Sequence, residues 1–210
     1  MEKDHRTFMP LLKEAEKFHG HLCAGQLIGV RMAMLGLREL GIADPRGRDK
    51  KRLIVYVEID RCATDAIMTV TGCRVGKRNM KVMDYGKMAA TFIDLATERA
   101  VRIVSLPEAR QTAAAMYPDL DEGQAQMKAY PEMDDGALFS VQDVTVFLRP
   151  EDLPGRPLGQ EKCAVCGETV LDCRELREDE LVRCRPCATN NRYYSGRALP
   201  RQPLEKRAVV

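Results

Sequence analysis

Two pairs of cysteines near the C-terminus constrain this chain more than any other feature of its sequence. They stand in CAVCG, residues 163–167, and in CRPCA, residues 184–188, with seventeen residues between the pairs. A C-x2-C turn holds two thiolates at a separation that suits a tetrahedral Zn²⁺ ion, and the glycine after the first pair permits a tight turn. The spacing predicts one structural zinc ion with four ligands: Cys163, Cys166, Cys184 and Cys187.

The residues around these pairs predict a small zinc-finger domain. We expect short strands in ETVLDC (168–173) and ELVRC (180–184), and a short helix that begins at the second pair. A knuckle, a hairpin and a helix that carries the second pair together describe a treble-clef-like finger. About fifty residues enclose too little core to fold unaided, so metal binding supplies much of the folding free energy.

Composition bears on what these cysteines do. The net charge of +2 is too small to indicate a polyanion partner, and no run of about eighteen apolar residues predicts a membrane span. The charged N-terminus lacks the apolar core of a signal peptide, so we expect a cytoplasmic protein. Eight cysteines in such a protein indicate metal binding or thiol chemistry rather than disulfides. Fe–S ligation and chance clustering remain open for the C-terminal set, in which Cys173 is expected to be a free thiol.

The fold class follows from the order of the patterns along the chain. Apolar residues at helical spacing predict helices over 7–18 and 26–40, and the second carries a ridge of small residues suited to close packing. Further helices are expected from residues 62 and 107, and the stretch 118–136 is expected only to cover the surface. Strands are predicted at 53–60, 80–86, 87–96, 100–107 and 138–148.

These elements do not alternate regularly, which indicates an α+β core with an antiparallel or mixed sheet packed with helices. The linker is RPEDLPGRPLGQ, residues 149–160, because it is rich in proline and glycine. We therefore expect two domains, the α+β core over 1–155 and a small C-terminal zinc-finger domain over 160–210.

A second group of metal-ligating residue types lies near the N-terminus. HGHLC, residues 19–23, places His19, His21 and Cys23 at alternate positions, which converge on one side of an extended chain. Cys62 and Asp65 come just after a predicted strand. Taken singly, such residues have ordinary structural roles, because a lone cysteine often serves as a small buried hydrophobe.

Four motifs, considered together, resemble the formylmethanofuran dehydrogenase E-subunit family. They are H-G-H-L-C-A-G at 19–25, R-C-A-T-D-A-I at 61–67, T-G-C-R-V-G-K-R-N at 71–79 and D-Y-G-K at 84–87. Ala24 replaces the usual proline of the first motif, and Arg74 replaces the usual threonine of the third. The resemblance covers residues 10–150, and members of the family often carry an appended C-terminal zinc finger on an α+β core.

The resemblance implies a metal or thiol site in the core, built from His21, Cys23 and Cys62. The metal there would be a second one, of unidentified kind, and a His and Cys donor set suits Zn²⁺ or another borderline-soft ion. Candidate catalytic residues implied nearby are His19, Asp65, Cys73 and Lys77. Asp65 would orient a histidine or act as a base.

The function implied by the resemblance is that of a metal-binding accessory protein. Its partners would be other subunits of a molybdenum or tungsten formylmethanofuran dehydrogenase, in the one-carbon metabolism of methanogens and other anaerobes, and a homodimer is expected. The chain has no ferredoxin-type cluster run and no sign of a pterin domain, so it is not expected to be a dehydrogenase by itself.

Two other interpretations stay open at this point. From Arg183 to Val210 the chain has seven Lys or Arg residues against one acid, with Tyr193 and Tyr194 among them. Such a tail is either a solvated segment or a nucleic-acid contact beside the zinc finger. A thiol-redox enzyme using Cys62 and Cys73 requires that the two thiols approach each other in the fold.

Overall fold

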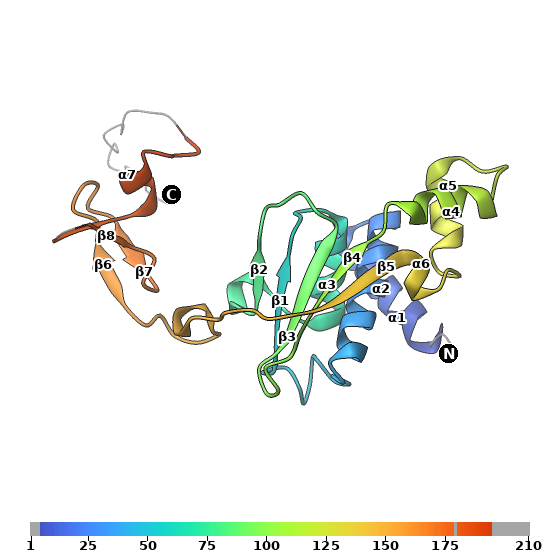
Figure 1. Cartoon of the computed structure of the whole chain (residues 1–210), viewed down its shortest axis with the longest axis horizontal. Helices are drawn as coiled ribbons and strands as arrows, with labels where there is room; N and C mark the ends of the chain where they lie inside the picture. The colour runs from blue at the N-terminus through green and yellow to red at the C-terminus, as the bar shows by residue number, and fades with distance from the viewer. Residues whose placement is uncertain (1–4, 179, 195–210) are drawn as a thin grey trace, which may run out of the picture. The chain divides into compact units, whose positions relative to one another are not determined.

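The computed structural model describes residues 5–178 and 180–194. The chain divides after Gly155 into two compact units, and each is described by itself. The first unit contains a sheet flanked by helices, and the second contains short hairpins and one helix (Figure 1). No helix within the described residues is long and apolar enough to cross a membrane.

Within the described part of the first unit, the sheet has five strands in the order β2–β1–β3–β4–β5. Strands β1 and β2 are parallel, whereas β1–β3, β3–β4 and β4–β5 are antiparallel. The sheet is therefore mixed, which confirms the predicted α+β class. The strand bounds are β1 Leu53–Val57, β2 Met80–Val82, β3 Ala89–Asp94, β4 Ala100–Ser105 and β5 Phe139–Val144.

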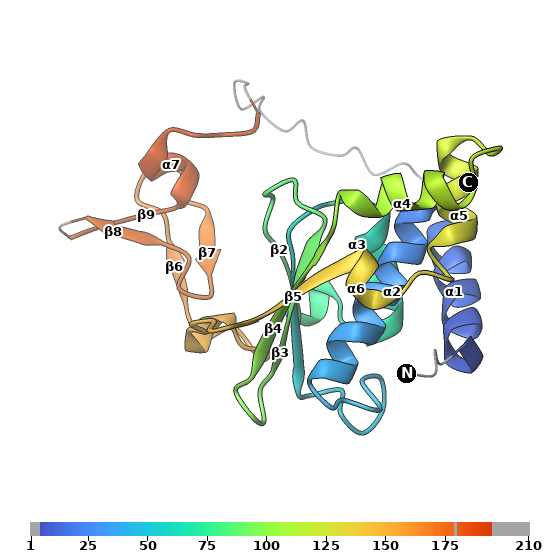
Figure 2. The same ribbon diagram turned by 45° about the vertical axis from the view of Figure 1, so that its right-hand side comes forward.

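One face of this sheet is covered by three helices, α1 His5–His19, α2 Ala24–Glu39 and α3 Cys62–Thr71 (Figure 2). The small residues of α2 allow the close packing that their spacing predicted. A Cβ at Gly29 would lie 2.5 Å from the carbonyl oxygen of Ala63 in α3, and one at Gly36 would lie 2.4 Å from the ring of Phe92 in β3. Both positions exclude any larger residue unless the backbone shifts.

The stretch 118–136 does more than cover the surface, contrary to expectation. It follows α4 Glu108–Met116 and forms α5 Glu122–Ala129 and part of α6 Asp135–Leu138. Asp121 caps α5 by accepting a hydrogen bond from the amide of Gln124. Arg31 of α2 donates to the carbonyls of Tyr130 and Met133, which holds this segment against the core. The sequence did not reveal these contacts, because the partner of the segment's backbone is a half-buried arginine about 100 residues away in the chain.

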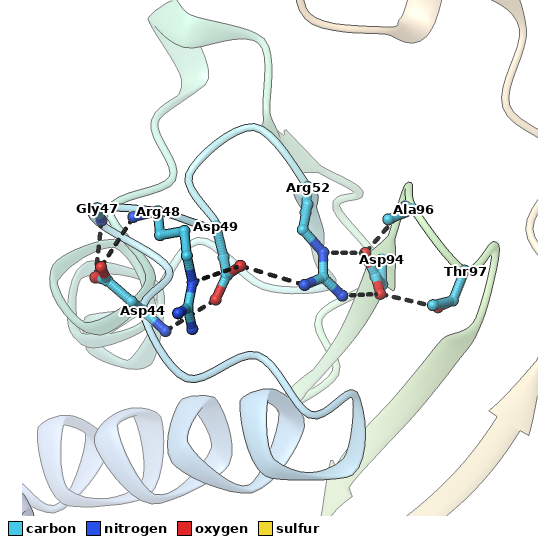
Figure 3. A network of polar contacts seen from close by, with 8 residues as sticks. All are labelled: Asp44, Gly47, Arg48, Asp49, Arg52, Asp94, Ala96 and Thr97. Carbon is cyan, nitrogen blue, oxygen red and sulfur yellow. Dashed lines mark hydrogen bonds and ion pairs between the residues drawn. The ribbon is translucent and has the colours of Figure 1, made fainter.

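A chain of ion pairs fixes the loop between α2 and β1 to the turn after β3 (Figure 3). The fully buried Asp94 accepts two hydrogen bonds from Arg52, at 2.6 and 3.1 Å, and one each from Ala96 and Thr97. These donors, the Arg52 guanidinium foremost, hold the pKa of the Asp94 carboxyl below its usual range. Arg52 also donates to the buried Asp49, so one guanidinium joins two carboxylates.

The second unit consists of β6 Gln160–Lys162, β7 Thr169–Leu171, β8 Leu176–Glu178, β9 Leu181–Arg183 and α7 Arg185–Thr189. The two strands expected between the cysteine pairs exist as β7 and β9, but they do not form one hairpin. Strand β7 pairs with β6, and β9 pairs with β8. Asp172 and Cys173 both adopt positive φ, which turns the chain between the two hairpins.

Candidate metal centres

The four cysteines of the second unit come together. Their sulfur atoms all lie within 4.8 Å of one another, in the group Cys163, Cys166, Cys184 and Cys187. The first pair stands on a knuckle in which the amide of Gly167 donates to the carbonyl of Cys163, and Gly167 takes the left-handed φ of +72°. Cys184 is the N-cap of α7, and Cys187 lies in its first turn.

The thiols of this group are electrostatically coupled. Backbone N–H groups of Cys166 and Cys184 lower the pKa of the Cys163 thiol to about 6. The Glu168 backbone N–H acts to lower the pKa of Cys166, but desolvation and the neighbouring thiols raise it to about 12. The cluster thus holds one thiolate readily and resists a second, which is the situation that a bound cation relieves. Cys173 is exposed and lies outside this group.

A second group lies in the first unit, where the ends of three helices meet. The ligand atoms of His19, Cys23 and Cys62 lie within 4.8 Å of one another. His19 is the last residue of α1, Cys23 is the N-cap of α2, and Cys62 is the first residue of α3. Two of the three are therefore at helix N-termini, where the helix dipole stabilises a thiolate.

His19 is held as a metal ligand would be. Its Nδ1 lies 2.8 Å from Oδ2 of Asp65, and its Nε2 is buried with no hydrogen-bond partner among the described residues. A buried ring nitrogen without a partner is costly. A carboxylate on one nitrogen and a metal on the other is the common arrangement of histidine ligands.

The residue that joins the two thiols is thus His19, whereas the family resemblance implied His21. The reason is the backbone at Gly20, whose φ of +96° ends α1 and reverses the chain. Residues 19–23 therefore do not form one continuous extended segment, since His19 is helical and Gly20 has a positive φ. His21 is exposed and its ring lies 4.6 Å from that of His19, outside the metal-ligating group.

Two further residues support the group, and the sequence analysis assigned neither of them to it. Gln26 is fully buried, and its Nε2 donates to the carbonyl of Cys62 at 2.6 Å. A Cβ at Gly25 would lie 3.0 Å from Cβ of Cys62 and 3.7 Å from Sγ of Cys23. Burial, followed by the neighbouring Cys23 thiol, raises the pKa of Cys62. The available signal was the sequence GQLIG, in which a glutamine stands in the first turn of the helix and is followed by apolar residues.

Cys73 and Lys77 lie away from this group, because they follow the opposite end of α3. The helix from Cys62 to Thr71 has ten residues, about 15 Å of rise. Cys73 is 1% exposed, its thiol is directed at the carbonyl of Leu53, and burial raises its pKa to about 11. Lys77 is exposed on the short 3-10 helix Val75–Lys77. The structure does not bring Cys62 and Cys73 together as a thiol pair.

The D-Y-G-K motif contacts the segment that joins the end of β1 to the start of α3, where Cys62 lies. The amides of Tyr85 and Lys87 donate to the carbonyl of Glu58, which follows β1 and precedes Cys62 by four residues. Of the basic C-terminal tail, residues 195–210 lie outside the described part of the chain. Tyr193 is fully exposed and Tyr194 is 51% exposed.

The chain matches a family model described as "FmdE, Molybdenum formylmethanofuran dehydrogenase operon" over residues 18–145. It is 25% identical, over 95% of its length, to a probable S-adenosyl-L-methionine-binding protein of Archaeoglobus fulgidus, and it spans 58% of that relative. It resembles the crystal structure of a tungsten formylmethanofuran dehydrogenase FmdE-like protein from Syntrophus aciditrophicus. That likeness has a TM-score of 0.58 at 23% identity, covers 89% of this chain and 95% of the other, and supports the fold alone.

Proposed function

The chain belongs to the FmdE family, and from this premise we propose that it is a metal-binding accessory protein with two metal centres. One centre is a structural zinc ion in a C-terminal finger, held by the four clustered cysteines. The other is a metal ion in the core, held by His19, Cys23 and Cys62.

The observation that carries this proposal is the environment of His19. Its Nε2 is buried without a hydrogen-bond partner among the described residues, and it belongs to a group whose other members are two thiols. Asp65 holds the opposite ring nitrogen and fixes the orientation of the ring. One nitrogen and two sulfur ligands suit zinc or another borderline-soft ion. Three protein ligands leave a fourth tetrahedral position open to water, a substrate or a receiving protein.

We assign the role of the core metal to an assembly rather than to this chain alone. Family membership supports association with other subunits of a molybdenum or tungsten enzyme of one-carbon metabolism. A homodimeric state is part of the same proposal and rests on the sequence resemblance alone. Delivery of metal or sulfur to such an enzyme is the activity that an open His and Cys site fits best.

The metal content per chain, measured by elemental analysis of anaerobically purified full-length protein, tests the proposal. We expect two equivalents in the unchanged chain, one in Cys23→Ser or His19→Ala, and two in Cys73→Ser, the matched control with a thiol outside both groups. Cys166→Ser should lose the other equivalent. If Cys23→Ser and His19→Ala retain two equivalents, the core site does not exist.

A further inference from the structure

A cavity of about 330 Å³ lies in the first unit beside the core metal group. It is lined by the start of α2, the residues before β3, the turn from β4 into α4, and α5. Ile28, Met88 and Leu106 give it apolar walls. Its volume is in the range of small-ligand sites, which are mostly apolar with a few placed polar groups.

The cavity and the core metal group share Gly25. This residue lines the cavity, and the space beside its Cα is filled by Cβ of Cys62 and Sγ of Cys23, at 3.0 and 3.7 Å from where a Cβ would stand. The neighbouring Ala24 also lines the cavity and is the first residue of α2. The N-cap of that helix, Cys23, makes no capping hydrogen bond with its side chain. The positive end of the α2 dipole therefore borders the cavity.

Two polar side chains of the lining have no partner among the described residues. Tyr130 is 3% exposed, yet no hydrogen bond to its hydroxyl is present in the described part of the chain. Arg110, which is exposed at the cavity, makes neither a side-chain hydrogen bond nor an ion pair there. The nearby carboxylate of Glu122 accepts a hydrogen bond from Gln126. An arginine and a tyrosine hydroxyl that line one cavity are the donors that a carboxylate takes.

Burial raises the pKa of Tyr130, and Arg110 acts in the opposite direction on the same group. The hydroxyl therefore stays protonated near neutral pH and is available as a donor. Arg110 and Tyr130 line the same cavity, which allows one anionic head to contact both.

We propose that this cavity binds a small organic acid, with its carboxylate on Arg110 and Tyr130 and its apolar body against Ile28, Met88 and Leu106. The body of the acid extends toward Gly25 and lies beside the open position of the core metal. That last step rests on the proposed function, whereas binding of the acid does not.

The test uses 3-phenylpropanoate as the probe and the uncharged 3-phenylpropanamide as its matched analogue. In full-length protein with labelled Ile and Met methyl groups, the acid should shift the NMR signals of Ile28 and Met88. Arg110→Gln should weaken binding of the acid about tenfold, the loss expected for one charge-assisted contact, and leave binding of the amide unchanged. Tyr130→Phe removes only the hydroxyl and should also weaken binding of the acid more than binding of the amide.

Arg99→Gln is the control, since Arg99 precedes β4 whereas the cavity lies after the end of that strand. It should leave both affinities unchanged. Equal loss for acid and amide in Arg110→Gln, or unmoved Ile28 and Met88 signals, overturns the proposal.

The metal content separates this inference from the proposed function. Acid binding with only one metal equivalent overturns the core metal site and leaves the cavity assignment standing. Two equivalents without acid binding overturn the cavity assignment alone. In Co²⁺-substituted protein, the acid should alter the part of the visible spectrum that Cys23→Ser removes. An unchanged spectrum overturns the placement of the acid beside the metal.

Discussion

The two candidate metal centres are built in opposite ways. The C-terminal group has four sulfurs from one knuckle and one helix turn, separated by seventeen residues. The core group has three candidate ligands from the ends of three helices that pack on a sheet with its own apolar core. The first group therefore has little apolar core around it, whereas the second is positioned by a large one.

The largest difference between the two units should therefore be their loss of structure when metal is removed. Chelation, or Cys166→Ser, should unfold residues 160–189, because structural metal in such small modules contributes on the order of 10 kcal/mol. Amide hydrogen exchange should show loss of protection there. The strands of the first unit should keep theirs, and a joint loss of protection would contradict the comparison.

The core should respond instead to its buried ion pairs. Asp94→Asn should lower the free energy of unfolding of the first unit by about 3 kcal/mol, because Arg52 then lacks its buried partner. Denaturant unfolding measures this, and the metal content should stay at two equivalents. Asp143→Asn, an exposed partner of Arg99, is the control and should change the free energy little.

The Asp94 carboxylate should also make the free energy of unfolding depend on pH. The pKa of Asp94 is lowered in the folded state, so its contribution to stability is full above the ordinary carboxyl pKa of about 4 and is lost as the pH falls through the lowered value. Unfolding measured between pH 6 and pH 3 should show a steeper decline for the unchanged protein than for Asp94→Asn. Parallel declines would exclude this carboxylate as the cause.

A smaller effect is expected from the residue behind the core ligand. Asp65→Ala should weaken core metal binding by about 10- to 100-fold, because His19 loses the acceptor that orients its ring. Competition with a chelator measures the change, and the finger should be unaffected. Asp84→Ala, an exposed aspartate in D-Y-G-K, is the matched control.

The least effect should come from the third core cysteine. Cys73→Ala removes one buried sulfur and should cost the first unit about 1 kcal/mol, with both metal equivalents retained. Thermal unfolding and elemental analysis together check this. Loss of a metal equivalent in Cys73→Ala would indicate that Cys73 belongs to the core metal site.

The sequence predicted what local patterns encode. The helical periodicity of 26–40 matches α2, and the α+β class follows from the order of the elements. The strand expected over 138–148 ends as β5 at Val144. Val146 and Leu148 continue as irregular chain and pack on the same apolar cluster as Val144.

The core site depends on contacts that no local pattern encodes. Spacing alone could not show that Gly20 reverses the chain and presents His19 rather than His21 to the thiols. Nor could it show that α3 separates Cys62 from Cys73, since that requires the length and direction of a helix. Gln26 was hidden for a similar reason, because its partner is the backbone of a residue 36 positions away.

The position of Gly25 between the cavity and the core group should couple ligand binding at the two places. A single backbone segment without a side chain separates the cavity from the sulfur of Cys23 and Cβ of Cys62. Any occupant that moves this segment changes the geometry of both sulfurs, and any metal that fixes the sulfurs changes the shape of the cavity. Linkage requires that each ligand then alter the affinity of the other by the same factor. Binding of the metal and binding of the acid would then be coupled through one glycine, by an equal factor in each direction.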